Sequence, residues 1–365
     1  MQRRELLKDL SILAGGALWA NSAWAAFITD EKPSSPVSFA SPIRGLVRKN
    51  GKLLQPVQLT IRHDGTDTTA ITKLNGREID RRVIPSGSHV FRVLTPAVSA
   101  PQQVEVECEV DGKTTLGSVE LRPVRRVQVY ILRHSHHDLG YTDLQATVED
   151  QQIRNISIGM DVARRTAGYP EGARFVWNLA VQWCADLLLR RKSQEEKAAL
   201  IEAVRNGWVS LNGMYANELT GLCRPEELLQ LFRFSRGLGR ECGVSVDSAM
   251  LSDVPGFTWG MATAMSQAGI RYFSAAPSLF DRIGTIMAEW QEKPFWWVSP
   301  SGNEKVLVWV PWTGYAMSHV MKVGPEWVGT YQDRLDAVNF AYDISYIRWS
   351  GHATTPNPTL RFASS

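Results

Sequence analysis

The chain has 365 residues, of which 44% are hydrophobic and 21% are charged, a composition typical of a soluble globular protein. Its 40 basic and 37 acidic residues give a formal charge of +3, so charge offers no reason to expect binding to nucleic acid or to an anionic membrane. The length is sufficient for two or three domains.

The first residues have the pattern of an export signal. Arg3 and Arg4 begin a basic segment, residues 11–20 are apolar, and small residues at 23 and 25 suit a signal peptidase. The apolar run is too short for a permanent membrane helix, and the paired arginines favour a twin-arginine signal over a general secretory one. We therefore expect residues 1–25 to be removed and the mature protein to be periplasmic or secreted, without a membrane segment.

The next part of the chain predicts a linker and a small β domain. Residues 26–41 are rich in Pro and Ser, which is typical of a linker. Apolar and polar residues then alternate with period two across residues 42–124, and turn pairs such as Asn75-Gly76 separate the runs. This pattern predicts a small antiparallel β-sandwich. A structural role is favoured over sugar binding, because no group of aromatic residues stands out.

After residue 124 the pattern changes to strands alternating with helices. Residues 127–132 and 248–251 are compact apolar runs typical of strands, and residues 195–204 and 225–241 read as helices. Such alternation over residues 125–350 predicts an α/β fold with a mainly parallel sheet or irregular barrel. In folds of this class, catalytic side chains gather at the carboxyl ends of strands.

Three histidines and an aspartate follow the first of these strands: His134, His136, His137 and Asp138. Imidazole and carboxylate groups are ligands of divalent metals. His136 and Asp138 are two residues apart, so both point the same way in an extended segment, and Gly140 allows the backbone to turn behind them. The segment predicts a metal site, with a polar surface loop as the alternative.

A second candidate is Asp253, which directly follows the strand at 248–251. Pro255 and Gly256 turn the loop behind it and leave the carboxylate at the end of the strand. An aspartate there can be a metal ligand, a nucleophile or both, whereas taken alone it is more often a turn or capping residue.

Four segments together resemble the catalytic domain of glycoside hydrolase family 38, the α-mannosidases, and occur in the family's order across residues 127–350. Residues 136–141 are similar to its His-x-Asp-x-Gly-aromatic element, and residues 206–209 with Glu218 to its Gly-Trp-Val element. Residues 252–256 are similar to its Asp-Pro-Phe-Gly element, although the order after the aspartate differs, and residues 295–309 to its substrate-loop and strand pattern. The resemblance implies an irregular seven-stranded (β/α) barrel of the glycoside hydrolase and deacetylase type.

The resemblance also implies one Zn²⁺ ion, held by His136, Asp138 and Asp253. In the family, the aspartate matching Asp253 is the nucleophile of a retaining hydrolysis of α-mannosides. Retention needs a second carboxyl group about 5 Å from the nucleophile, which protonates the departing oxygen. Asp343 is the candidate for this acid.

Three further residues are expected to bind the carbohydrate substrate. Tyr141 matches the aromatic position beneath the sugar, where the family usually has Trp. Trp208 belongs to the element similar to Gly-Trp-Val, and Glu218 is the reserve candidate for a polar contact in the site.

The end of the sequence departs from the family, whose members usually continue and carry a further zinc-binding histidine. Only His319 and His352 follow Asp253, in other contexts, so we expect a truncated catalytic domain followed by an irregular tail at residues 351–365. One added base before the Ala353 codon would permit a sequence resembling the family's Gly-Asp-Asn and Pro-Asp, which suggests a frameshift. Two alternatives to an active mannosidase remain. The truncation favours a non-catalytic or inactive carbohydrate-binding remnant, and the His/Asp metal site would also suit a metal-dependent carbohydrate deacetylase.

Overall fold

The computed structural model describes residues 37–39, 42–278, 289–312, 314–315 and 331–351. The chain divides into two compact units, residues 1–124 and 125–365. The expected signal segment at residues 1–25 and the tail from residue 352 lie outside the described residues. Among the helices in the described ranges, none is long and apolar enough to cross a membrane.

The first unit contains two four-stranded antiparallel sheets. One consists of β1 (Val37–Phe39), β2 (Val47–Lys49), β3 (Lys52–His63) and β6 (Gly87–Pro96), and the other of β4 (Thr68–Leu74), β5 (Arg77–Ile84), β7 (Gln102–Val110) and β8 (Lys113–Leu121). Alternate side chains of both sheets, among them Leu59 and Val106, form a single hydrophobic core, because successive side chains of a strand point to opposite faces.

Two details of this unit bear on the predictions. Asn75 and Gly76, which join β4 to β5, have positive φ angles of 46° and 76°, as a tight two-residue hairpin turn requires. Residues Val37–Phe39, expected in the linker, instead pair with β3. Pairing with a neighbouring strand satisfies backbone groups that a solvated linker would expose to water.

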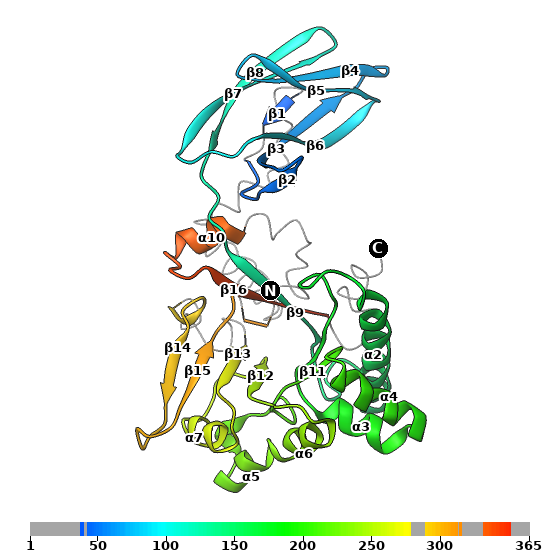
Figure 1. The fold of residues 1–365 in the computed structure, drawn as a ribbon, viewed down its shortest axis with the longest axis vertical. Coiled ribbons are helices and arrows are strands. Elements are labelled where there is room, and N and C mark those ends of the chain that lie inside the picture. The colour runs from blue at the N-terminus through cyan, green and yellow to red at the C-terminus, as the bar shows by residue number, and fades with distance from the viewer. Residues whose placement is uncertain (1–36, 40–41, 279–288, 313, 316–330, 352–365) are drawn as a thin grey trace, which may run out of the picture. The chain divides into compact units, whose positions relative to one another are not determined.

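The second unit contains two further four-stranded sheets (Figure 1). The first has the order β11 (Val209–Leu211), β10 (Trp177–Leu179), β9 (Gln128–Ser135) and β16 (Ile344–Gly351), and all its pairs are parallel. The second has the order β12 (Ser248–Ser252), β13 (Tyr272–Ala276), β15 (Lys305–Trp309) and β14 (Phe295–Val298), where only β14 is antiparallel to its neighbour. The expected α/β class is therefore confirmed.

A single hydrogen-bonded barrel of seven strands is not confirmed. In the described residues no ladder joins β11 to β12 or β15 to β16, so the parallel strands form two sheets. Other contacts occupy these junctions. The Gly213 amide donates to the Ser248 carbonyl at 2.8 Å, and the Tyr346 hydroxyl donates to the Trp309 carbonyl at 2.8 Å.

Helices pack around these sheets (Figure 1): α2 (Gln145–Thr166), α3 (Trp183–Arg191), α4 (Gln194–Arg205), α5 (Pro225–Gln230), α6 (Arg233–Cys242), α7 (Gly260–Gln267) and α10 (Tyr331–Ala337). The helix expected at residues 225–241 is two helices, α5 and α6. The chain turns at Leu231 and Phe232 between them, and the Phe232 ring is buried in the core.

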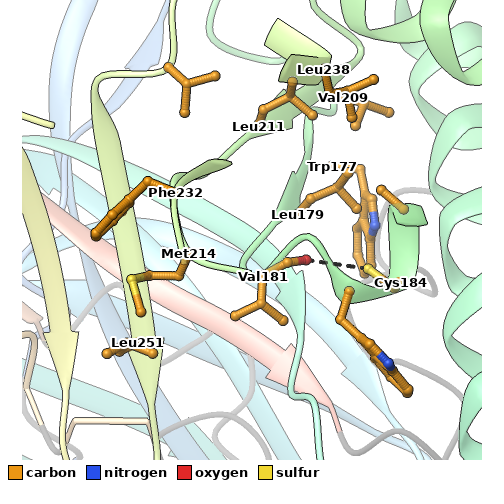
Figure 2. Close-up of a cluster of buried hydrophobic side chains, with 14 of the residues drawn as sticks. Trp177, Leu179, Val181, Cys184, Val209, Leu211, Met214, Phe232, Leu238 and Leu251 are labelled. Carbon is orange, nitrogen blue, oxygen red and sulfur yellow. Dashed lines mark hydrogen bonds between the residues drawn. The ribbon is translucent and has the colours of Figure 1, made fainter. Parts of the chain in front are cut away.

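The main core of this unit packs around Trp177 of β10 (Figure 2). Helix α2 approaches the indole closely at Gly159, where a Cβ atom would lie 2.7 Å from Cγ of Trp177. Only glycine fits this position without displacing the ring. The thiol of Cys184 is buried in the same core and donates to the Val181 carbonyl at 3.4 Å.

Candidate metal centre

His136, Asp138 and Asp253 come together at the carboxyl ends of β9 and β12. One potential ligand atom of each lies within 4.8 Å of the other two. Nε2 of His136 is 3.2 Å from Oδ1 of Asp138 and 3.8 Å from Oδ2 of Asp253. The side chains are 2%, 14% and 19% exposed, respectively. Two segments more than a hundred residues apart in the sequence thus supply one compact group of donors.

The two separations measured from His136 fit a zinc ion. Zinc binds imidazole nitrogen and carboxylate oxygen at about 2.0–2.2 Å, which places the ligand atoms of a tetrahedral site about 3.4 Å apart. The observed separations of 3.2 and 3.8 Å lie on either side of that value. The three ligands, an imidazole and two carboxylates, equal in number the protein ligands of catalytic zinc sites, where a fourth position stays open for a reactant.

The His136 loop is fixed by a buried glutamine of α2. The Gln152 side-chain amide donates to the His136 carbonyl at 2.9 Å and accepts a hydrogen bond from the Ser135 hydroxyl at 2.7 Å. Gly140 has a φ of 105°, a left-handed conformation that glycine adopts readily. The chain can therefore turn away directly after Asp138 and leave its carboxylate beside the imidazole.

Asp253 has an unusual backbone conformation. Its φ is 53°, a left-handed value that costs a non-glycine residue roughly 1–2 kcal/mol. Its amide donates to the Ala276 carbonyl at 2.9 Å, and the Ser278 hydroxyl donates to Oδ1 of its carboxylate at 3.0 Å. Strain of this kind persists where surrounding contacts fix the residue, often at functional sites.

Asn217, which the sequence did not single out, links the two loops that carry the ligands. Its side-chain amide donates to the His137 carbonyl at 3.3 Å, and its oxygen accepts from the Ser252 amide at 3.1 Å. The residue lies beyond the carboxyl end of β11, and this place in the chain is the signal that could have identified it. Glu218, the residue predicted to make a polar contact in the site, accepts a hydrogen bond from the adjacent Leu219 amide at 3.1 Å.

A tyrosine ring lies beside the cluster, but it is not the expected one. The Tyr315 ring stacks on the His136 imidazole, with centroids 5.1 Å apart and planes inclined by 26°. Tyr141, expected beneath the sugar, is 86% exposed to solvent. The aromatic face next to the candidate ligands therefore comes from the segment that follows β15.

The other two histidines of the segment are buried. Burial, together with the nearby His136 ring, lowers the pKa of His137 to about 3, and its Nε2 lies 3.3 Å from Sγ of Cys184. Burial and the charge of Arg348 hold the pKa of His134 well below its usual value. Both imidazoles are therefore neutral at pH 7, and neither belongs to the cluster of candidate ligands.

Asp343 does not lie at the metal centre. It directly precedes β16, which runs parallel to β9 with Gly351 opposite Ser135. Eight residues of extended chain, roughly 26 Å, separate it from the edge of the sheet that carries the cluster. The side chain is exposed. This position does not support Asp343 as the acid.

Trp208 is also remote from the cluster. It precedes β11, at the amino edge of the first sheet, and its carbonyl accepts a hydrogen bond from the Trp177 amide at 2.9 Å. The Arg164 guanidinium lies 5.9 Å from the centre of its ring. These contacts assign Trp208 to packing between α2 and the sheet.

The strands of the second unit also line a cavity of about 220 Å³. Its walls include Asn178, Ser210, Met250 and Tyr346, whereas His136, Asp138 and Asp253 are not among the lining residues. Two of its polar side chains are already engaged: Asn178 donates to the Arg133 carbonyl, and the Tyr346 hydroxyl to the Trp309 carbonyl. The metal centre is therefore distinct from this cavity.

Comparison with known proteins agrees with the α/β fold of the second unit. The family model for the N-terminal domain of glycosyl hydrolases family 38 matches residues 126–349. An α-mannosidase from Enterococcus faecalis V583 is structurally similar, with a TM-score of 0.50 and 16% identity over 65% of this chain and 26% of that one. A second Enterococcus faecalis protein in the same family has a TM-score of 0.45 and 16% identity over 61% and 23%.

The chain thus spans about a quarter of the length of these solved structures. A search of curated protein sequences found no match. The family model covers more than half of the chain and includes all three candidate ligands. The protein therefore belongs to glycosyl hydrolases family 38, and its second unit is the N-terminal domain of that family.

Proposed function

We propose that the protein is an exported glycoside hydrolase that cleaves α-mannosides with retention of configuration, with Asp253 as nucleophile and one zinc ion as cofactor. One observation carries the proposal: an imidazole and two carboxylates converge at the carboxyl ends of parallel strands in a family 38 domain. Carboxylates at this edge can reach a substrate bound over the sheet.

The ligand residues have distinct tasks in this proposal. His136, Asp138 and Asp253 would hold the zinc ion, which would supply a positive charge that binds sugar hydroxyls and favours a distorted ring. The hydrogen bond from Ser278 fixes the rotation of the Asp253 carboxylate. The Tyr315 ring beside His136 offers an apolar face for one side of the sugar.

The reaction has two steps. In the first, an oxygen of Asp253 forms a bond to the anomeric carbon while the glycosidic bond breaks, and the departing oxygen receives a proton from an acid. In the second, water attacks the same carbon and gives its proton to the conjugate base of that acid, the bond to Asp253 breaks, and the carboxylate is regenerated. Two inversions give net retention.

Asp343 is remote from the metal centre, so the acid that protonates the leaving group is not identified. The test therefore uses a sugar whose leaving group needs no proton. The chain is loaded with zinc, incubated with a 5-fluoro-α-mannosyl fluoride, digested and analysed by mass spectrometry. We expect a fluoromannosyl group on the peptide that contains Asp253, because fluorine slows the second step and the intermediate accumulates. Asp253→Asn should remain unlabelled.

The matched control is Asp247→Asn. Asp247 lies at the amino end of the same strand, where it pairs with Arg271 at 2.5 Å. Labelling of this variant should equal that of the unaltered chain. A label on another residue, or an unlabelled chain that binds zinc, would contradict the assignment, and release of acetate from acetylated sugars would instead favour the deacetylase.

We also propose export by the twin-arginine route, supported by Arg3 and Arg4 ahead of the apolar run at residues 11–20. Replacing both arginines by lysine should leave the protein in the cytoplasm, as measured by cell fractionation. Continued export of that variant would favour a general secretory signal.

A further inference from the structure

A buried arginine lies between the two sheets of the second unit. Arg348 of β16 is 3% exposed. Within the described residues it forms no ion pair with a carboxylate, and its guanidinium contacts neutral acceptors instead. A buried charge is costly to leave unpaired, so its retention at this position needs a reason.

The contacts of Arg348 extend over both sheets. Nε donates to Nε2 of His134 at 3.4 Å, in β9 of the first sheet. Nη1 donates to the Leu251 carbonyl at 3.0 Å, and Nη2 donates to the Ser252 hydroxyl, both in β12 of the second sheet. A longer contact of 3.4 Å joins Nη1 to the Ser274 carbonyl of β13.

Two of these contacts are made to residues that lie close to the candidate ligands in the sequence. His134 precedes His136 by two residues, and Ser252 immediately precedes Asp253. The two halves of the metal centre belong to different sheets, which no strand ladder joins in the described part of the chain. We propose that Arg348 is a positioning residue that holds the His136–Asp138 half of the site against the Asp253 half.

The fork of the guanidinium suits this role. Its nitrogens are held in one plane, so it can donate in several directions at once, whereas the ammonium of lysine is a compact charge on a flexible stem. A lysine at this position would keep the charge but could not hold both sheets in the same geometry. The variant Arg348→Lys therefore separates positioning from charge.

The sign of the effect on metal affinity distinguishes two roles. If Arg348 acted only through its charge, it would repel a divalent cation, and replacing it by methionine would strengthen zinc binding. If it positions the ligands, both Arg348→Met and Arg348→Lys should weaken binding. Residues that orient metal ligands typically change metal affinity by about 10- to 100-fold, and we expect a loss in that range.

The experiment measures zinc affinity of the full chain by competition with a chromophoric chelator. Ser252→Ala is the mild variant, because it removes one contact of Arg348 and leaves the backbone intact. The double variant Arg348→Lys/Ser252→Ala should have about the same zinc affinity as whichever single variant binds zinc less tightly, since both substitutions remove the same contact between Arg348 and Ser252. Additive losses, or zinc affinity unchanged or increased in folded Arg348 variants, would overturn the proposal.

A matched control removes another arginine that burial affects. Arg334 of α10 lies over the Trp312 ring at 4.1 Å, and burial lowers its pKa to about 10, as it does for Arg348. The variant Arg334→Met should lower thermal stability but leave zinc affinity within about twofold. An equal loss of affinity in this control would mean that the Arg348 effect reflects general destabilisation.

The inference rests on the proposed metal site, so a second measurement works without metal. Hydrogen exchange of the zinc-free chain should be faster in Arg348→Lys at residues 133–138 and also at 250–254, because each half of the site loses its hydrogen bonds to the guanidinium. Faster exchange confined to β16, or none, overturns the proposal. If the unaltered chain binds no zinc while both segments exchange faster in Arg348→Lys, the positioning role of Arg348 is supported and the proposed zinc cofactor is refuted.

Discussion

Lowering the pH from 7 to 5 should destabilise the second unit through His137. Burial lowers the pKa of this imidazole from 6.5 to about 3, so the folded state keeps it neutral where the unfolded chain binds a proton. Its contribution to stability is complete above pH 6.5 and is lost as the pH falls towards 3. At pH 5 the loss relative to pH 7 is about 2 kcal/mol.

Urea unfolding followed by tryptophan fluorescence measures this loss. Residues 42–124 contain no tryptophan, so after removal of residues 1–25 the emission reports on the second unit. A chelator keeps the chain free of metal, which would add its own pH dependence. The free energy of unfolding is determined at pH 7 and at pH 5.

The variant His137→Gln assigns the effect, because glutamine keeps a neutral polar side chain near Cys184 but does not titrate. The difference in stability between pH 7 and pH 5 should shrink by about 2 kcal/mol in this variant. An unchanged difference would refute the reasoning and assign the acid sensitivity to other groups, among them His134.

Four further outcomes are expected. Gly159→Ala should cost about 1–3 kcal/mol of stability, seen in urea unfolding, because the added methyl meets the Trp177 ring; a neutral effect would contradict the close approach. Burial raises the pKa of Glu292, so the folded state holds its proton more tightly than the unfolded chain and stability falls as the pH rises above 4.5; Glu292→Gln should flatten this slope in urea titrations. Asn217→Ala should weaken zinc binding about tenfold in chelator competition, because it frees both ligand loops. Zinc at 100 times its Kd should stabilise the chain by about 2.7 kcal/mol in thermal melts, and Asp253→Asn should remove most of that gain.

The candidate ligands could be predicted because each follows a strand with a clear apolar pattern. His136 and Asp138 lie two residues apart after β9, and Asp253 follows β12 before a turn. Local sequence thus identified both segments, and the parallel order of the strands brings them together. Neither segment alone indicates that the two share one metal site. That expectation came from the family resemblance.

The residues that support the site could not be found in the same way. Tyr315 and Arg348 are single side chains from distant parts of the chain, and no local pattern marks them, whereas Asn217 is indicated only by its place beyond the carboxyl end of β11. Their contacts depend on how loops and strands meet in space, as with the Arg348 contacts to His134 and Ser252. Such residues become visible only once the fold places them.

The differences between the predictions and the structure have physical causes as well. Asp343 precedes β16, whereas the candidate ligands follow their strands. In a parallel sheet these two positions lie at opposite edges. The sequence pattern does not predict helix α2, because buried polar residues, among them Gln152 and Asn155, interrupt its apolar stripe. Both polar side chains form hydrogen bonds inside the unit, which offset the cost of burial.

The most direct test of the metal centre is a crystal of the zinc-loaded chain measured on both sides of the zinc absorption edge. We predict one anomalous peak, within bonding distance of Nε2 of His136 and of carboxylate oxygens of Asp138 and Asp253. A peak at other residues, or none in a crystal with these three side chains ordered, would contradict the central claim.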